Sequence, residues 1–109
     1  MVKEINQYEV YWISLDPTQG SEMAKTRPCV VVSPNEMNQY LHTLVIIPIT
    51  STIKTYPWRI HCTISGKQGS VATDQIKVVD RARIGSKISS LSNVEISKLK
   101  EVLQRMLID

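Results

Sequence analysis

The sequence lacks the signatures of common metal, nucleotide and serine-hydrolase sites. Its two histidines, His42 and His61, stand nineteen positions apart, and its two cysteines, Cys29 and Cys62, form no CxxC pair. No P-loop, no GxGxxG stretch and no nucleophile elbow occurs. We therefore predict that any chemistry uses Arg, Glu, Asp, Ser, Thr or His side chains, with no metal and no cofactor.

Long apolar segments are also absent. No apolar run approaches the roughly 20 residues that a membrane-spanning helix needs, and the first seven residues contain no apolar core of a secretory signal. We therefore expect a cytoplasmic protein with no membrane partner. In that setting Cys29 and Cys62, which both lie inside apolar runs, are expected to be reduced core residues rather than a disulfide.

The composition is that of an ordinary globular chain. It has 109 residues, 42% hydrophobic and 21% charged, with no low-complexity tract and no internal repeat, which argues against disorder and against a solenoid. This length predicts one domain, residues 1–109, with a single modest core. The net charge of +3 is compatible with a nucleic acid or another polyanion, but so small an excess does not decide the partner.

Short apolar or alternating segments predict a mainly β protein, because β-branched and aromatic residues are typical of strands. The expected strands are residues 8–15, 28–33, 44–49, 59–64, 70–80 with a kink near Asp74 and Gln75, and a short one within 81–87. One helical turn is expected at 36–40 and a chain reversal at 66–69. Since Pro48 has no N–H to donate, the third strand should carry a bulge there or be unpaired on one side.

The pattern changes to helical periodicity after residue 91. Ser92 and Glu95 form a capping box, and apolar residues follow at helical spacing. Glu101 and Arg105 form an i,i+4 pair on the other face. The apolar stripe comprises residues 96, 99, 102, 103, 106 and 107. We predict that this stripe is core and that the helix packs against a small barrel or half-barrel.

A charged loop, residues 16–27, runs directly into the second apolar segment. Pro28 favours an extended conformation at Arg27, so Arg27 is expected at the mouth of a strand. Thr50 and Ser51, where the third strand ends, would leave their hydroxyls accessible. A charged loop on a rigid strand is a common way to build a site, but the same pattern is equally compatible with a surface turn.

Side chains of Arg, Glu, Asp, Ser, Thr and His suit phosphoryl chemistry on RNA. There the substrate brings its own nucleophile, the 2′-hydroxyl, so a protein needs only to position it, move protons and neutralise the phosphorane. An arginine does the last task well because its guanidinium matches two phosphate oxygens. The sequence thus permits metal-free RNA cleavage without requiring it.

Four segments together resemble the MazF/PemK/Kid toxin family. Their order and spacing match, and with the C-terminal helix they cover nearly the whole chain. Each motif is short and moderately specific, whereas the set is strongly specific. The segments are residues 11–22 (YWISLDPTQGSE), 25–33 (KTRPCVVVS), 45–51 (VIIPITS) and 71–81 (VATDQIKVVDR).

The resemblance implies the toxin of a type II toxin–antitoxin system, a metal-independent endoribonuclease that cleaves single-stranded RNA, mostly mRNA, at short sequences. The 2′-hydroxyl would attack the adjacent phosphate and leave a 2′,3′-cyclic phosphate and a 5′-hydroxyl. It also implies an SH3-like, CcdB-like barrel that forms a homodimer and binds RNA across the dimer groove. A cognate antitoxin would neutralise it by placing its tail in that groove.

The resemblance assigns roles to matched positions. Arg27 matches the catalytic arginine before proline, as general acid and transition-state stabiliser. Thr50 matches the threonine that orients the scissile phosphate, with Ser51 as its neighbour, and Glu22 matches a loop glutamate that accepts a proton or contacts RNA. Without the resemblance, Arg27 could instead pair with Glu22 on the surface, and Thr50 and Ser51 could cap a turn.

The Kid branch of the family offers a different base. There an aspartate takes that role, and Asp74 with Gln75 matches the corresponding pair. However, the arginine that Kid carries two residues earlier is Ala72 here, and its loop histidine is Ser21. The MazF-like branch is therefore the better template, and Asp74 could equally brace the backbone kink through its side chain.

We predict that Ser51, Asp74 and Gln75 bind RNA, and further RNA-binding candidates lie around them. Ser21 and Lys25 belong to the charged loop. Tyr56 and Trp58, in the loop after the third strand, would stack on bases or, with equal weight, pack against the protein. His61, on the polar face of the fourth strand, is better explained as a bystander.

Two other functions fit the same fold. A CcdB-like toxin would inhibit DNA gyrase by binding it, but such chains act through C-terminal residues and lack the combination of Arg27 and Thr50. A catalytically silent relative that binds RNA or an antitoxin is also compatible with the sequence.

Overall fold

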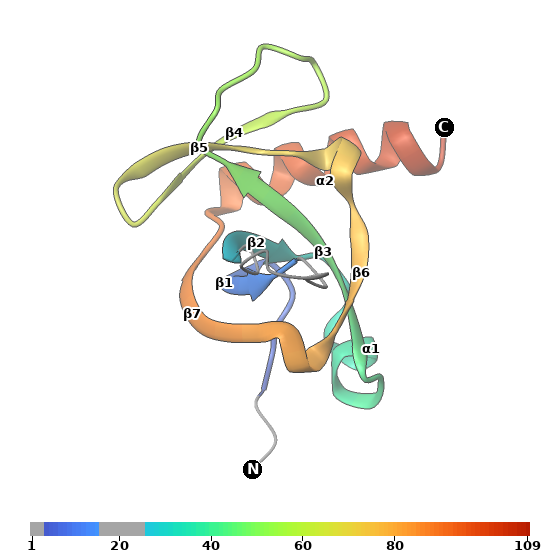
Figure 1. Ribbon diagram of the computed structural model, residues 1–109. Coiled ribbons are helices and arrows are strands. Elements are labelled where there is room, and N and C mark those ends of the chain that lie inside the picture. The colour runs from blue at the N-terminus through green and yellow to red at the C-terminus, as the bar shows by residue number, and fades with distance from the viewer. Residues whose placement is uncertain (1–3, 16–25) are drawn as a thin grey trace, which may run out of the picture.

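The computed structural model describes residues 4–15 and 26–109, which form a curved sheet with a C-terminal helix packed against it (Figure 1). The strands are β1 (Glu9–Ser14), β2 (Thr26–Val31), β3 (Thr43–Thr50), β4 (Ile60–Ile64), β5 (Lys67–Val71), β6 (Lys77–Asp80) and β7 (Ile84–Ser90). The helices are α1 (Asn35–Tyr40), α2 (Asn93–Leu107) and two short 3-10 turns, η1 (Thr73–Gln75) and η2 (Arg81–Arg83). The predicted fold class, mainly β with a C-terminal helix, is confirmed.

The sheet bends at β3. Its strands are ordered β4-β5-β3-β2-β1-β7, and β6 pairs with β3 beside this path. One edge of β3 pairs with β2, while the other pairs with β6 over residues 43–46 and then with β5 over 49–50. The change of partner falls at Pro48, whose carbonyl accepts a hydrogen bond from the Ala72 amide at 2.9 Å and whose nitrogen has no proton to donate. The predicted interruption of pairing on one side of Pro48 is therefore confirmed.

Alternate residues of the curved sheet face two separate apolar clusters. On β1, Val10 belongs to one cluster, whereas Tyr11 and Ile13 belong to the other. Helix α2 covers the first cluster with Leu99, which is fully buried. At these three residues β1 is therefore covered on both faces, and the single modest core predicted from length is divided in two.

Strand β4 shows the predicted alternation most clearly. Ile60, Cys62 and Ile64 are buried, and His61 and Thr63 are exposed. Cys62 and the equally buried Cys29 are free thiols, as predicted. Burial raises the pKa of each thiol to about 12, because a thiolate would be desolvated there.

Helix α2 begins with the predicted capping box. Ser92 Oγ accepts from the Glu95 amide at 3.2 Å, and Glu95 Oε1 accepts from the Ser92 amide at 2.8 Å. Glu95 Oε2 also accepts from the Thr63 amide at 2.9 Å, which ties the helix start to β4. The stripe prediction is wrong at the other end, where Met106 and Leu107 are 39% and 60% exposed because the helix runs past the sheet. Within the described residues, no helix is both long and apolar enough to cross a membrane.

Several predicted boundaries differ from the structure, and three of the differences have a clear structural cause. β2 begins at Thr26, two residues before the expected start, because the ladder with β1 extends to the pair Ser14–Thr26. The reversal expected at 66–69 is a tighter turn at Ser65 and Gly66, both with positive φ, so residues 67–69 join β5. The last strand starts at residue 84 rather than 81, because η2 occupies the intervening residues.

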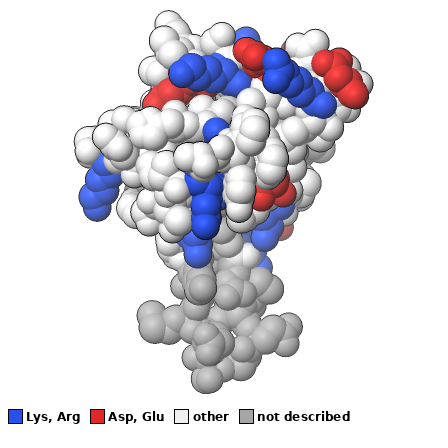
Figure 2. Space-filling model, turned by 90° about the horizontal axis from the view of Figure 1, so that it is seen from above, with Lys and Arg blue, Asp and Glu red and all other residues white. Residues whose placement is uncertain are grey.

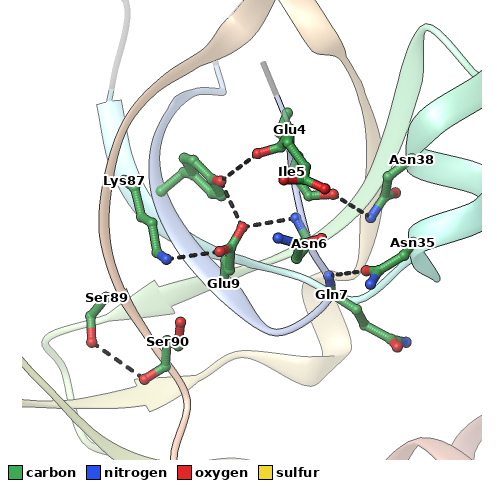
Figure 3. Close-up of polar contacts among 11 residues, drawn as sticks. Glu4, Ile5, Asn6, Gln7, Glu9, Asn35, Asn38, Lys87, Ser89 and Ser90 are labelled. Carbon is green, nitrogen blue, oxygen red and sulfur yellow. Dashed lines mark hydrogen bonds and ion pairs between the residues drawn. The ribbon is translucent and has the colours of Figure 1, made fainter. Parts of the chain in front are cut away.

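Glu9 ties the N-terminal segment to the sheet (Figure 3). Its Oε1 accepts hydrogen bonds from the Asn6 amide at 2.8 Å and the Tyr11 hydroxyl at 2.7 Å, and its Oε2 lies 2.8 Å from Lys87 Nζ. Burial alone would raise the pKa of Glu9, but the bonds from Lys87, Tyr11 and Asn6 outweigh it and lower the pKa to about 2. The ionised carboxylate is therefore part of the folded structure.

We expect this network to make stability depend on pH below about 4.5. The folded-state pKa of Glu9 is about 2 and its ordinary value is 4.5, so its contribution is full above pH 4.5 and is lost as the pH falls towards 2. Urea unfolding should show the wild type losing an advantage of roughly 1–3 kcal/mol over Glu9→Gln across that range. A difference between the two chains that stays constant with pH would contradict this expectation.

Candidate functional site

A pocket of about 380 Å³ opens where residues of six strands and two connecting turns meet, and we call it the strand-end pocket. It brings together three residues singled out in the sequence, Arg27, Thr50 and Ser51, although they come from two strands and a loop. Its lining comprises Trp12, Arg27, Pro28, Ile49, Thr50, Ser51, Ile64, Ser65, Lys67, Gln68, Gly69 and Ile88.

The pairing of β2 with β3 brings Arg27 beside Thr50. The β2–β3 pairing ends at Cys29 and Pro48, and Arg27 and Thr50, each two residues beyond that pair, both line the pocket. Arg27 is exposed and Thr50 is half-buried. The predicted extended conformation of Arg27 is confirmed, with Arg27 as the second residue of β2.

The Thr50 hydroxyl has a defined direction. Its Oγ1 accepts a hydrogen bond from the Thr52 amide at 3.1 Å. The turn-capping role that the sequence left open is therefore present. A hydroxyl that accepts one bond still carries its own proton, so Thr50 can also donate to a ligand oxygen in the pocket.

Asp74 is outside this pocket and belongs to a brace. Its two carboxylate oxygens accept from Arg59 Nε at 2.9 Å and Arg59 Nη2 at 3.0 Å. The hydrogen bonds from Arg59 lower the pKa of Asp74. In the adjacent position, the Thr73 hydroxyl donates to the Trp58 carbonyl. Together these bonds fasten the end of the loop 51–58 to η1, which is the bracing alternative raised for Asp74.

Tyr56 and Trp58 stack on each other. Their ring centroids are 4.8 Å apart with an interplanar angle of 13°, and the Arg59 guanidinium lies 5.7 Å from the Tyr56 centroid. Trp58 also lines a second pocket of about 220 Å³, against Val102 and Met106 of α2. The packing alternative for this pair is thus observed, and their outer faces stay partly exposed.

The other predicted site residues fall outside the strand-end pocket or outside the described chain. Gln75 is exposed on η1, where its backbone N–H donates to the Ala72 carbonyl at 2.8 Å. Ser21, Glu22 and Lys25 lie outside the described residues, so their predicted contacts with RNA and the predicted proton transfer by Glu22 stay predictions.

Sequence reasoning missed Trp12, Lys67 and Gln68 as pocket residues. Trp12 was expected only as part of an apolar strand, and residues 67 and 68 only as part of a turn. The signal that locates Trp12 is its register, since it lies opposite Pro28 and hence beside Arg27. That register could be read only with the pairing in hand.

Positive charge near the pocket is local rather than spread over a patch. Figure 2 shows Lys and Arg side chains at separate points of the upper face, with acidic side chains among them. Among the pocket's described lining residues, the charged ones are Arg27 and Lys67, both cationic. Within residues 4–15 and 26–109, no group of three His, Cys, Asp or Glu side chains is placed to hold a metal ion. Metal-free chemistry stays a prediction.

Comparison with known proteins decides the family. A sequence model described as the PemK-like, MazF-like toxin of type II toxin–antitoxin systems matches residues 6–107. The chain belongs to this family. This PemK/MazF-like chain is 32% identical over 93 residues to the endoribonuclease toxin MazF of Escherichia coli K12, a match that covers 84% of each protein. The resemblance drawn from the four segments is therefore confirmed.

Solved structures share the PemK/MazF-like fold. MazF from Deinococcus radiodurans superposes with a TM-score of 0.82 at 23% identity, covering 97% of this chain and 98% of that one. A mycobacterial endoribonuclease in complex with its cognate antitoxin superposes with a TM-score of 0.80 at 22% identity, covering 94% of each chain. At these identities the likeness shows the fold, and it confirms the predicted barrel architecture.

Gly69 lets β5 approach β3 beside Thr50. A Cβ at position 69 would lie 3.0 Å from Ile49 Cγ2 and 3.2 Å from the Thr50 carbonyl oxygen, so in Gly69→Ala the Ile49 side chain and the β3 backbone must give way by a few tenths of an ångström. We expect this variant to lose roughly 1–3 kcal/mol of unfolding free energy, measured by urea denaturation.

Gly66→Asn in the same hairpin is the matched control. Gly66 has a φ of +81°, which asparagine tolerates better than most residues, and a Cβ there meets no atom within 4 Å. The control should therefore lose much less stability than Gly69→Ala. Equal losses in the two variants would show that contact with β3 is not what Gly69 provides.

Proposed function

We propose that this chain is the toxin of a type II toxin–antitoxin pair and acts as an endoribonuclease on single-stranded RNA, mostly mRNA. The observation that carries the proposal is the placement of Arg27 beside Thr50 in one pocket, in a chain that belongs to the PemK/MazF-like toxin family. A gyrase-binding toxin would have no need of a cation and a hydroxyl aligned in this way.

The proposed reaction is an internal transfer within the RNA. The 2′-oxygen forms a bond to phosphorus as its proton leaves, and the bond from phosphorus to the 5′-oxygen breaks as that oxygen gains a proton. The products are a 2′,3′-cyclic phosphate and a 5′-hydroxyl, so no water or cofactor enters the balance. Glu22 is our candidate proton acceptor.

Arg27 would supply the charge that this reaction requires. As the phosphate passes through the phosphorane, negative charge grows on its non-bridging oxygens, and a guanidinium can donate to two of them at once. The exposed position on β2 leaves Arg27 accessible to a polymer. We also assign it the protonation of the leaving 5′-oxygen.

Thr50 and Ser51 would orient the phosphate. Thr50 Oγ1 accepts a hydrogen bond from the Thr52 amide, and this bond fixes the direction of the hydroxyl's own proton. The hydroxyl can therefore donate to a phosphate oxygen without rearrangement. Asp74 is not assigned to the chemistry in this proposal, because the hydrogen bonds from Arg59 lower the pKa of its carboxylate and so make it a weaker base.

The proposal includes two protein partners. The solved structures that share this fold include one described as an endoribonuclease in complex with its cognate antitoxin, and we propose that an antitoxin also binds this chain. A pocket with Arg27 and Lys67 on its rim suits an acidic segment of such a partner. We further propose a homodimer whose groove holds the RNA.

The first test is cleavage in EDTA. Purified protein should cut single-stranded RNA with the metal chelated, and Arg27→Ala should be slower by on the order of 10²-fold or more because transition-state charge loses its partner. Arg105→Ala, which removes a 75%-exposed arginine side chain from α2, is the matched control and should cut normally. End mapping should find cyclic phosphates. If the RNA stayed intact and the protein instead inhibited DNA supercoiling by gyrase, the proposal would be wrong.

A second test separates the two roles of Asp74. If Asp74 acts only through its brace, Asp74→Asn and Arg59→Met should slow cleavage by similar, modest factors and leave its pH profile unchanged. If Asp74 were the general base, Asp74→Asn would be slower by orders of magnitude than Arg59→Met. Single-turnover rates across pH 5–9 distinguish the two results.

A further inference from the structure

Trp12 is an exposed aromatic side chain in the strand-end pocket. It is 43% exposed, although its neighbours on β1, Tyr11 and Ile13, are buried. Val10 and Trp12 share one face of β1, and the lining residues Ile49 and Ile64 belong to the same apolar cluster as Val10. The pocket is therefore the open end of a core.

The backbone under Trp12 is held closely. A Cβ at Gly85 of β7 would lie 3.0 Å from the Trp12 carbonyl oxygen, so β7 approaches β1 there more closely than a side chain at this position would usually permit. On the other side, Trp12 lies opposite Pro28 of β2. Trp12 thus has strands on both sides while its indole lines the pocket.

Gln68 contributes a polar group to the same pocket. Its Oε1 lies 3.4 Å from His61 Nε2, across the β4–β5 hairpin. When His61 Nε2 carries its proton, it donates to that oxygen and leaves the amide NH₂ of Gln68 as a donor for a ligand. His61, expected to be a bystander, therefore contacts a residue of the pocket.

The combination of groups matches one kind of ligand. A flat indole with aliphatic neighbours favours a flat aromatic ring, an amide can hydrogen-bond the polar edge of such a ring, and Arg27 and Lys67 suit the attached phosphates. The volume of about 380 Å³ lies near the lower end of the range of roughly 300–1,000 Å³ typical of small-molecule sites, which suits one nucleotide rather than an oligonucleotide.

We propose that the strand-end pocket holds the nucleobase next to the scissile phosphate, stacked on Trp12, with its polar edge bonded by Gln68. The two side chains then set part of the RNA sequence that is cut. This inference rests on the proposed RNA cleavage. In that function Arg27 and Thr50 contact the phosphate, which every substrate has. Trp12 and Gln68 contact the base, which differs between substrates.

The first experiment uses the chain's two tryptophans, Trp12 and Trp58, as separate reporters. In Trp58→Phe the emission comes from Trp12 alone, and we would titrate it with 2′-O-methyl nonanucleotides of mixed A, C and U, which lack the attacking hydroxyl. Saturable quenching of Trp12 is expected, because a base stacks on the indole. Binding of the oligonucleotide, followed by anisotropy, without quenching of Trp12 would overturn the proposal.

The second experiment maps cleavage sites on a random RNA pool. Trp12→Ala should weaken binding by roughly 5- to 100-fold, the range of one lost base stack, while Trp12→Phe retains most of it. Gln68→Ala should broaden the base preference at one position beside the cut, because the bond to the polar edge of the base is lost. Tyr40→Ala, which removes an 83%-exposed ring from α1, is the matched control. Unchanged preference in Gln68→Ala would refute its role in reading the base.

The outcomes separate this inference from the proposed function. Quenching of Trp12 without any cleavage would retain the base site and reject the nuclease. Cleavage with normal affinity and preference in both Trp12→Ala and Gln68→Ala would retain the nuclease and reject the base site. Quenching of Trp12 by an acidic peptide but not by the oligonucleotide would assign the pocket to a protein partner and reject the inference.

Discussion

The partner change of β3 at Pro48 is the constraint on which the rest of this structure depends. A strand has two edges, and β3 pairs with β2 over residues 46–48 on one of them while dividing the other between β6 and β5. Pro48 suits the position where β3 changes partner, because a backbone N–H is not needed where the pairing is interrupted and proline has none. The sheet bends there, and alternate residues of its strands face the two apolar clusters. The same bend places the end of β3, with Thr50, against β5.

The site follows from that bend. Strands β2 and β5 approach the end of β3 from opposite edges, so β2 brings a cation and β5 brings the hairpin residues to the same hydroxyl. Gly69 and Gly85 are needed for this geometry because each allows a close approach of backbone that a methyl group would obstruct. By contrast, the loop with Tyr56 and Trp58 is attached to η1 by Arg59 and Asp74, and so forms a separate unit beside the pocket.

Local signals in the sequence predicted local structure well. The capping box at Ser92, the alternation of Ile60 and Cys62, and the interruption at Pro48 each arise within a few residues, and the structure confirms them. Arg27 and Thr50 could be related only through the family resemblance, since 23 positions separate them in the sequence. Trp12 was missed because its exposure depends on where the surrounding strands end. The buried end predicted for the helix was wrong because periodicity cannot show where the sheet beneath a helix stops.

The two buried thiols have a consequence for chemical durability. Cys29 lies two residues after Arg27 on β2, and Cys62 lies beneath the hairpin that carries Gln68, so oxidation of either sulfur would distort the pocket from below. With the pKa of each raised to about 12, almost no thiolate exists near neutral pH, and neither sulfur is accessible to a reagent in the folded chain. Electrophiles and peroxide therefore react with these sulfurs only in molecules that have opened. The fold thus insulates its pocket from redox chemistry without needing to exclude cysteine from its sequence.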